Sequence, residues 1–204
     1  MPLLSVTSDT LVTRLWTVAP TSTPAHRALR SVALAVVGTL LLTIAAKIQV
    51  PFYPVPMTMQ TFVVLTLGMA YGWRLGGATL ILYLAEGAAG LPVFAGTPEK
   101  GIGIVYMLGG TGGYLVGFVL AAAVCGWLAE RGWDRNVATT ALAMLAGNVL
   151  IYVPGLLRLG ILYGWDKPIL EWGLTPFILG DLTKLALAAA VLPFAWKLLR
   201  KRQA

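Results

Sequence analysis

Long apolar stretches, interrupted by short polar or glycine- and proline-rich segments, make up most of the chain after residue 28. A run of about 20 predominantly apolar residues is long enough to cross a bilayer as an α-helix. The pattern predicts six spanning helices, at residues 29–48, 58–71, 75–90, 106–129, 137–159 and 174–199. The second and third are short for this role, so we expect one or both to be tilted, broken or extended by irregular backbone.

Three connecting segments are long and rich in glycine or proline: residues 49–57, 91–103 and 160–173. Three prolines between residues 51 and 56 exclude regular helix there and predict an ordered loop. Residues 1–28 mix polar and apolar positions and lack the basic-then-apolar order of a cleavable signal peptide. We therefore expect a loose cytoplasmic arm, residues 1–28, followed by one six-helix membrane domain, residues 29–204.

Lysine and arginine are unevenly divided between the two sides that six spans would create. One side carries ten: Arg14, Arg27, Arg30, Arg74, Arg131, Arg135, Lys197, Arg200, Lys201 and Arg202. The other side carries four: Lys47, Lys100, Arg158 and Lys167. Because basic residues favour the cytoplasmic side, this bias places both termini in the cytoplasm and the three long connecting segments outside.

Composition agrees with a polytopic, all-α membrane protein. Of 204 residues, 58% are hydrophobic and 11% are charged, whereas a soluble domain carries about a quarter charged residues. Lipid must therefore solvate most of the surface. The net charge of +7 gathers at the ends of the apolar stretches and forms no stripe with interleaved aromatics, so we expect no nucleic-acid partner.

Residues for catalysis are scarce. The chain holds a single histidine, His26, and a single cysteine, Cys125, so multi-cysteine metal sites are excluded. It contains neither a Gly-x-x-x-x-Gly-Lys-Ser/Thr phosphate-binding loop nor a His-Glu-x-x-His motif. A binding role is therefore favoured over an enzymatic one, without a cofactor or a metal.

The presence of ionisable and amide side chains inside the predicted spans must be explained by structure or function, because each costs a few kcal/mol to insert. Asp181 and Lys184 stand at positions i and i+3 on one face of the last span. They form either a structural ion pair or the polar wall of a cavity that binds a neutral polar group. Asn148, within the fifth span, suits either an interhelical hydrogen bond or a ligand contact. Glu86, near the outer end of the third span, either extends to the interface or binds a ligand.

Two further features have alternative interpretations. Thr58 and Gln60, directly after the proline-rich segment, either cap the second span or contact a ligand. Small residues recur every four positions, at Gly68, Gly72 and Gly76, at Gly113 and Gly117, and at Ser31, Ala35, Thr39 and Thr43. Such spacing allows close helix contact. For the glycines we favour packing within the bundle, and for the first-span stripe a surface offered to another membrane subunit.

Five motifs, spread in order over residues 30–200, resemble those of the BioY family, the biotin-specific S components of energy-coupling factor (ECF) vitamin transporters. The first is the proline-rich segment VPFYPVPMTMQT, residues 50–61. The others are GAAGLPVFAG at residues 87–96, GTGGY at 110–114, Gly147-Asn148 with Tyr152, and GDLTK at 180–184.

This resemblance implies a six-helix S-component bundle in a bacterial inner membrane, with biotin bound near its outer face beneath the first loop. It assigns Asp181 and Lys184 to the ureido ring of biotin. Asn148, Thr58, Gln60 and Tyr114 match motif positions, and Phe52, Tyr53 and Phe94 are aromatics suited to cover the apolar part of the ligand. Lys100 has the charge that the biotin carboxylate needs, although it lies in a segment that is longer and more charged than the all-glycine version of many members.

The implied partners are a transmembrane coupling protein and a pair of ABC-type ATPases, although some members act without them. Homo-oligomerisation is left open. Two alternatives remain: an S component for another vitamin, and a membrane scaffold without a ligand. An intramembrane enzyme is the weakest of the readings.

Overall fold

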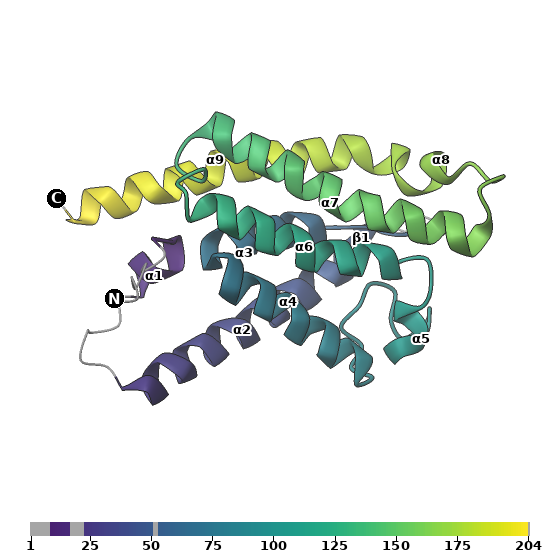
Figure 1. Cartoon of the computed structure of the whole chain (residues 1–204), viewed down its shortest axis with the longest axis horizontal. Coiled ribbons are helices and arrows are strands. Elements are labelled where there is room, and N and C mark those ends of the chain that lie inside the picture. The colour runs from purple at the N-terminus through teal and green to yellow at the C-terminus, as the bar shows by residue number, and fades with distance from the viewer. Residues whose placement is uncertain (1–8, 17–22, 51–52, 204) are drawn as a thin grey trace, which may run out of the picture.

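The computed structural model describes residues 9–16, 23–50 and 53–203, and its main body is a bundle of helices (Figure 1). Six helices in the described part have 12 or more residues: α2 (Pro24–Lys47), α3 (Gln60–Tyr71), α4 (Trp73–Ala88), α6 (Gly112–Ala129), α7 (Val137–Tyr163) and α9 (Ile178–Gln203). Shorter elements connect them: α1 (Leu11–Leu15), α5 (Gly103–Met107), α8 (Ile169–Gly173) and the 3-10 turn η1 (Thr175–Phe177). Two short strands, β1 (Gln49–Val50) and β2 (Met57–Thr58), pair antiparallel between α2 and α3.

The bundle has two different ends. The end at the right of Figure 1, with α5 and α8, gathers the segments that follow α2, α4 and α7; we call it the loop end. The opposite end holds α1, the start of α2, the α3–α4 and α6–α7 turns and the end of α9; we call it the terminal end. This division matches the expected placement of the three long connecting segments on one side.

Four segments are long and apolar enough to cross a membrane: α2, α6, α7 and residues 169–199. Helix α3 is apolar but has only 12 residues, about 18 Å at the α-helical rise of 1.5 Å per residue. Helix α4, with 16 residues, is also short of the roughly 20 that a span requires. The expected shortness of these two helices is confirmed, and the count of six crossings stays a prediction.

Helix boundaries differ from the expected ones for local reasons. Helix α2 begins at Pro24, inside the expected arm, because Thr23 Oγ1 accepts a hydrogen bond from the amide of His26 at 3.3 Å and proline suits the first turn. The fourth expected span divides into α5 and α6, and the glycines at 109–110 lie in the break. Helix α7 extends four residues beyond residue 159, and α9 starts four residues after 174 because η1 precedes it.

Helix α6 lies at the centre and packs against α3, α4 and α7. Ala121, Ala122 and Cys125 on it are fully buried. A side chain at Gly68 of α3 would meet the backbone of Ala122 at 2.5 Å, and one at Gly117 would meet the backbone of Ile151 on α7 at 2.6 Å. The glycines therefore permit close helix packing within the bundle, as expected.

The small-residue stripe on α2 is only partly the exposed surface that we expected, since Ser31 is exposed and Thr43 is half-buried. Ala35 and Thr39 are buried, and Thr39 Oγ1 donates to Glu86 Oε1 of α4 at 3.1 Å. Glu86 is thus half-buried and bonded within the bundle rather than extended to the interface. The exposed face of α2 is formed instead by large apolar residues: Leu29, Val32, Val36, Val37, Leu40, Leu41 and Ile44.

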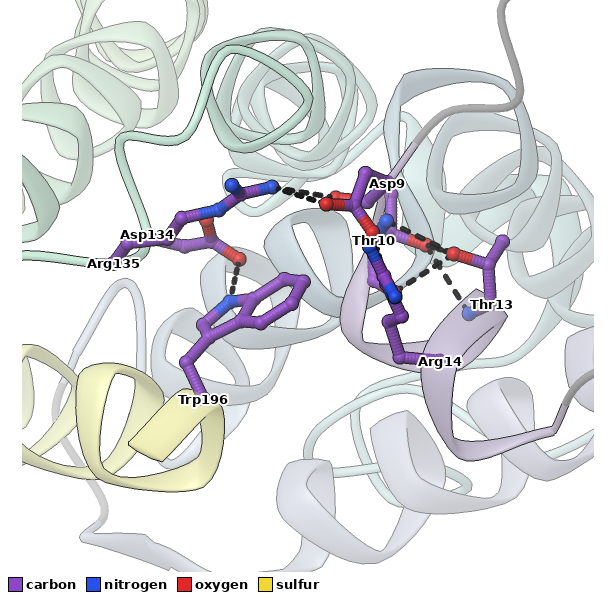
Figure 2. Close-up of polar contacts among 7 residues, drawn as sticks. All are labelled: Asp9, Thr10, Thr13, Arg14, Asp134, Arg135 and Trp196. Atoms are coloured by element: carbon purple, nitrogen blue, oxygen red, sulfur yellow. Dashed lines mark hydrogen bonds and ion pairs between the residues drawn. The ribbon is translucent and has the colours of Figure 1, made fainter. Parts of the chain in front are cut away.

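Part of the expected loose arm is packed against the terminal end (Figure 2). Thr10 and Leu11 are buried, and α1 contacts α3 and α9. Asp9 pairs with Arg14 at 2.5 Å and, across the fold, with Arg135 at 2.7 Å. Residues 9–15 are therefore held by both burial and charge, which the mixed sequence pattern did not indicate.

Candidate ligand-binding site

A cavity lies at the loop end, between the helices and two of the connecting segments. It encloses about 450 Å³ of space between the atoms, counting the part that opens outward. Its lining is formed by Val55, Pro56, Thr58, Gln60, Thr61, Ala95, Thr111, Tyr114, Phe118, Ile151, Tyr152, Phe177, Asp181 and Lys184. Most of these side chains are apolar or aromatic, and the polar ones come from α3, α7, α9, the start of α6 with Thr111 before it, and the segment before α3.

Asp181 and Lys184 form an ion pair on the cavity wall, at 2.9 Å between Lys184 Nζ and Asp181 Oδ1. Their side chains are only 7% and 11% exposed, respectively. Lys184 Nζ also donates to Thr61 Oγ1 at 2.9 Å and to the carbonyl of Thr58 at 2.7 Å. All three ammonium protons therefore have an acceptor.

The carboxylate of Asp181 is bonded just as fully. Thr61 Oγ1 donates to its Oδ1 at 3.1 Å, and the hydroxyl of Tyr152 donates to its Oδ2. The network joins α9 to α3 and α7, as the structural interpretation of the pair requires. It also lines the cavity, as the ligand interpretation requires. The wall carries no net charge, and a ligand with both donors and acceptors could exchange bonds with it.

Thr58 and Gln60 enter the lining at the start of α3. Thr58 Oγ1 accepts a hydrogen bond from the amide of Gln60, the first residue of α3, at 3.2 Å, but the N-cap position belongs to Met59, which makes no side-chain cap bond. The side chain of Gln60 is 3% exposed, and its Nε2 donates to the hydroxyl of Tyr83 at 2.8 Å. Thr58 therefore supports the start of α3 without being its N-cap, and both residues lie on the cavity wall.

Tyr114 and Asn148 occupy different positions around the ion pair. Tyr114 lines the cavity, packs edge-on against Tyr152 and donates to the carbonyl of Gly173 at 2.8 Å. Asn148 instead lines a smaller void beside Asp181 and Lys184, and its buried Oδ1 accepts no hydrogen bond from the described residues. Asn148 is thus close to the polar network without facing the main cavity.

Three further expected residues among those that the structure describes do not join this lining. Tyr53 is 77% exposed, and Phe94 is buried behind the wall, where it stacks on Tyr106 and closes against Gly87. Lys100 packs along Gly96 within the segment after α4. Phe52 falls outside the described residues.

The structure adds lining residues that the sequence analysis did not assign to the site, although Tyr152 and Thr61 lie within motifs that it named. Tyr152 follows Asn148 by four residues and so shares its helix face, which was a usable signal. Thr61 follows Gln60 directly and bridges Asp181 and Lys184. The apolar wall, including Phe118 and Phe177, had no such signal because apolar residues occupy nearly every span position.

The segment after α4, which contributes Ala95 to the cavity, is anchored from outside by Lys47. Lys47 Nζ donates to the carbonyls of Phe94 and Thr97 and to Thr97 Oγ1, each at 3.0 Å. No group of three or more His, Cys, Asp or Glu side chains that could hold a metal occurs in the described part of the chain.

Comparison with known proteins identifies relatives of this arrangement. The model of the BioY family matches residues 16–201. The chain is 35% identical, over 79% of its length and 93% of the relative's, to the probable biotin transporter BioY of Pyrococcus horikoshii. It is 36% identical, over 80% of its length and 94% of the relative's, to the biotin transporter BioY of Thermotoga maritima.

One solved structure has the same fold, namely the crystal structure of the S-component for biotin from an ECF-type ABC transporter. The TM-score is 0.71 over 86% of this chain and 95% of that one, with 22% sequence identity. At this identity the likeness establishes the fold of the bundle.

Proposed function

The chain belongs to the BioY family, and we propose that it is a membrane-embedded subunit that binds biotin for uptake. The observation that carries the proposal is the buried, neutral Asp181–Lys184 pair on the wall of an otherwise largely apolar cavity. The names of its relatives, biotin transporters, point to the same ligand.

The chemistry of biotin fits this cavity. Its ureido ring presents two N–H donors and one carbonyl acceptor, and its valeryl chain is apolar. Asp181 accepts from a ring N–H, and Lys184 donates to the carbonyl oxygen. Because ligand bonds replace the existing bonds to Thr61, Thr58 and Tyr152, no buried charge is left unpaired during the exchange.

The remaining expected residues take places around this centre. Gln60, Thr58 and Tyr114 complete the wall, and the Asn148 oxygen, which has no partner within the described part of the chain, is available beside the ion pair to support it. Phe52, Tyr53, Phe94 and Lys100 belong to the two connecting segments that supply Val55 and Ala95. In our proposal these segments close over the apolar chain and the carboxylate of biotin after it enters.

Topology gives the proposed direction of transport. With six crossings and both termini in the cytoplasm, the loop end and its cavity would lie outside; ten basic residues on one side against four on the other support this orientation. The chain would take biotin from outside a bacterial inner membrane and release it inward. A transmembrane coupling protein and ABC-type ATPases would drive that step, since the sequence has no phosphate-binding loop of its own.

The direct test is retention of labelled biotin by the purified, detergent-solubilised chain. We expect binding at nanomolar concentration that unlabelled biotin displaces and that thiamine and riboflavin, at a hundredfold excess, do not. Displacement by thiamine or riboflavin would assign the site to another vitamin. Failure of the folded protein to bind any of the three would refute the proposal.

A ligand-free scaffold is the alternative that the structural side of the ion pair favours, since Asp181 and Lys184 join three helices. Asp181→Asn separates the two. A scaffold should lose thermal stability and have no biotin affinity to lose. A binding subunit should lose biotin affinity while the variant still elutes as a folded, monodisperse species.

A further inference from the structure

The side-chain amide of Gln60 has a defined orientation, set by two residues behind the cavity wall. Its Nε2 lies 2.8 Å from the hydroxyl of Tyr83, and that hydroxyl lies 2.8 Å from the carbonyl of Val93. Tyr83 is fully buried and Gln60 is 3% exposed. Because these groups are buried and lie within hydrogen-bond distance, each of the three must be matched as donor or acceptor.

The match has one solution. A carbonyl only accepts, so the single proton of the Tyr83 hydroxyl must go to Val93. The same hydroxyl is then an acceptor toward Gln60, which must present its NH₂ group. The amide oxygen of Gln60 therefore faces the other way, toward Thr58 and the cavity that both residues line.

The Gln60–Tyr83–Val93 chain of hydrogen bonds, which we call the relay, ends at the carbonyl of Val93, and the residues around this carbonyl are tightly packed. Val93 and Phe94 are buried, and the ring of Phe94 meets Tyr83 edge-on at 5.4 Å. A side chain at Gly87 would come within 2.0 Å of that ring, so only glycine permits this packing. Lys47 fixes the next carbonyl, that of Phe94, from outside at 3.0 Å. The Val93 carbonyl is thus a fixed acceptor for Tyr83.

We propose that Tyr83 is a positioning residue of the ligand site: it turns the Gln60 amide so that the oxygen accepts a hydrogen bond from a ligand N–H. This inference rests on the proposed function and extends it. The cavity then offers two side-chain acceptors, Asp181 and Gln60, to a ligand such as biotin that carries two ureido N–H groups. Without the Tyr83 hydroxyl, the NH₂ group of Gln60 has no acceptor behind the wall, so the amide turns this group toward the cavity, where it opposes a ligand N–H.

A double-mutant cycle tests the relay through Tyr83→Phe, Gln60→Leu and the double variant, with biotin affinity as the readout. We expect each single change to weaken binding about tenfold, the effect of one lost hydrogen bond. Tyr83→Phe should then change affinity less than twofold in the Gln60→Leu background, because its effect passes through Gln60. Independent effects, multiplying to about a hundredfold, would show that Tyr83 only anchors the segment after α4 and would overturn the inference.

Tyr71→Phe is the matched control. Its hydroxyl also donates to a backbone carbonyl of another helix, Leu34 at 2.9 Å, but Tyr71 does not line the cavity. It should leave biotin affinity unchanged. If Tyr83→Phe fails to fold, the biotin affinity of Gln60→Leu becomes the test. Unchanged affinity in that folded variant would overturn the inference. A wild-type chain that binds no biotin would instead refute the proposed function.

Discussion

The two ends of the bundle each hold a buried carboxylate, and the two carboxylates differ in their hydrogen-bond partners. At the loop end, Asp181 accepts from Lys184, Thr61 and Tyr152, and this network borders a cavity. At the terminal end, fully buried Asp134 accepts from Trp196 Nε1 at 2.5 Å, and its other oxygen has no partner among the described residues.

The neighbouring cation explains part of this difference. Arg135 follows Asp134 directly, but its guanidinium pairs with Asp9 and lies over the ring of Trp196, 4.6 Å from its centroid. Figure 2 shows this arrangement between α9, the α6–α7 turn and residues 9–14. The charge at this end therefore attaches the N-terminal segment to the bundle. A paired carboxylate that lines a cavity suits exchange with a ligand, whereas a buried carboxylate held by a tryptophan of a neighbouring helix suits a structural contact.

The largest effect should come from removing both charges of the loop-end pair. In Asp181→Asn with Lys184→Gln the wall stays neutral and polar, and replacing a buried ion pair as a unit costs little stability. Biotin affinity should fall at least a hundredfold, roughly 2.7 kcal/mol, while the thermal unfolding temperature changes by only a few degrees. Binding within tenfold of wild type would contradict the assignment of the pair to the ligand.

At the terminal end the effect should appear in stability alone. Trp196→Phe keeps the ring but leaves the buried Asp134 carboxylate without its Trp196 donor, at a cost of about 2 kcal/mol. We expect a lower unfolding temperature with unchanged biotin affinity. Trp127→Phe is the control at the same end, because Trp127 is 46% exposed and its replacement should have little effect. A loss of biotin affinity in Trp196→Phe would break the proposed division between the ends.

The smallest expected effect is a pH dependence of the free energy of unfolding, caused by Asp134 at the terminal end. Burial raises the pKa of Asp134 from 3.8 to about 6, although the hydrogen bond from Trp196 opposes the shift. The folded protein therefore binds this proton more tightly than the unfolded chain does, so stability falls as the pH rises from about 4 to 6. Between pH 5 and pH 7 the loss should be about 1 kcal/mol.

The other carboxylate at this end does not mask that trend. The hydrogen bond from Arg14 lowers the pKa of Asp9, so its contribution is present above the ordinary aspartate value and is lost only at lower pH. Thermal unfolding at pH 5, 6 and 7 should show the dependence in the wild type and a flatter curve in Asp134→Asn. An unchanged slope in that variant would assign the pH dependence to another group.

Much of this architecture could be predicted from the sequence because membrane insertion depends on local properties. Runs of apolar residues mark the helices, and the cost of burying Asp181 and Lys184 in such a run singles them out. Their i, i+3 spacing predicts the contact that forms. The helix ends were harder to place, since the start of α2 depends on the Thr23 cap and the break before α6 on the conformation of the glycine-rich segment.

The sequence by itself determined the class of protein, the approximate helices and the polar pair, because hydropathy and short-range spacing act within one helix. Only the tertiary structure decided which distant groups meet. The carbonyl of Thr58 reaches Lys184 and Asp9 reaches Arg135 across 126 positions, and the Gln60–Tyr83–Val93 relay joins two helices and a connecting segment. Such contacts depend on the packing of whole helices against α6, which no local pattern specifies.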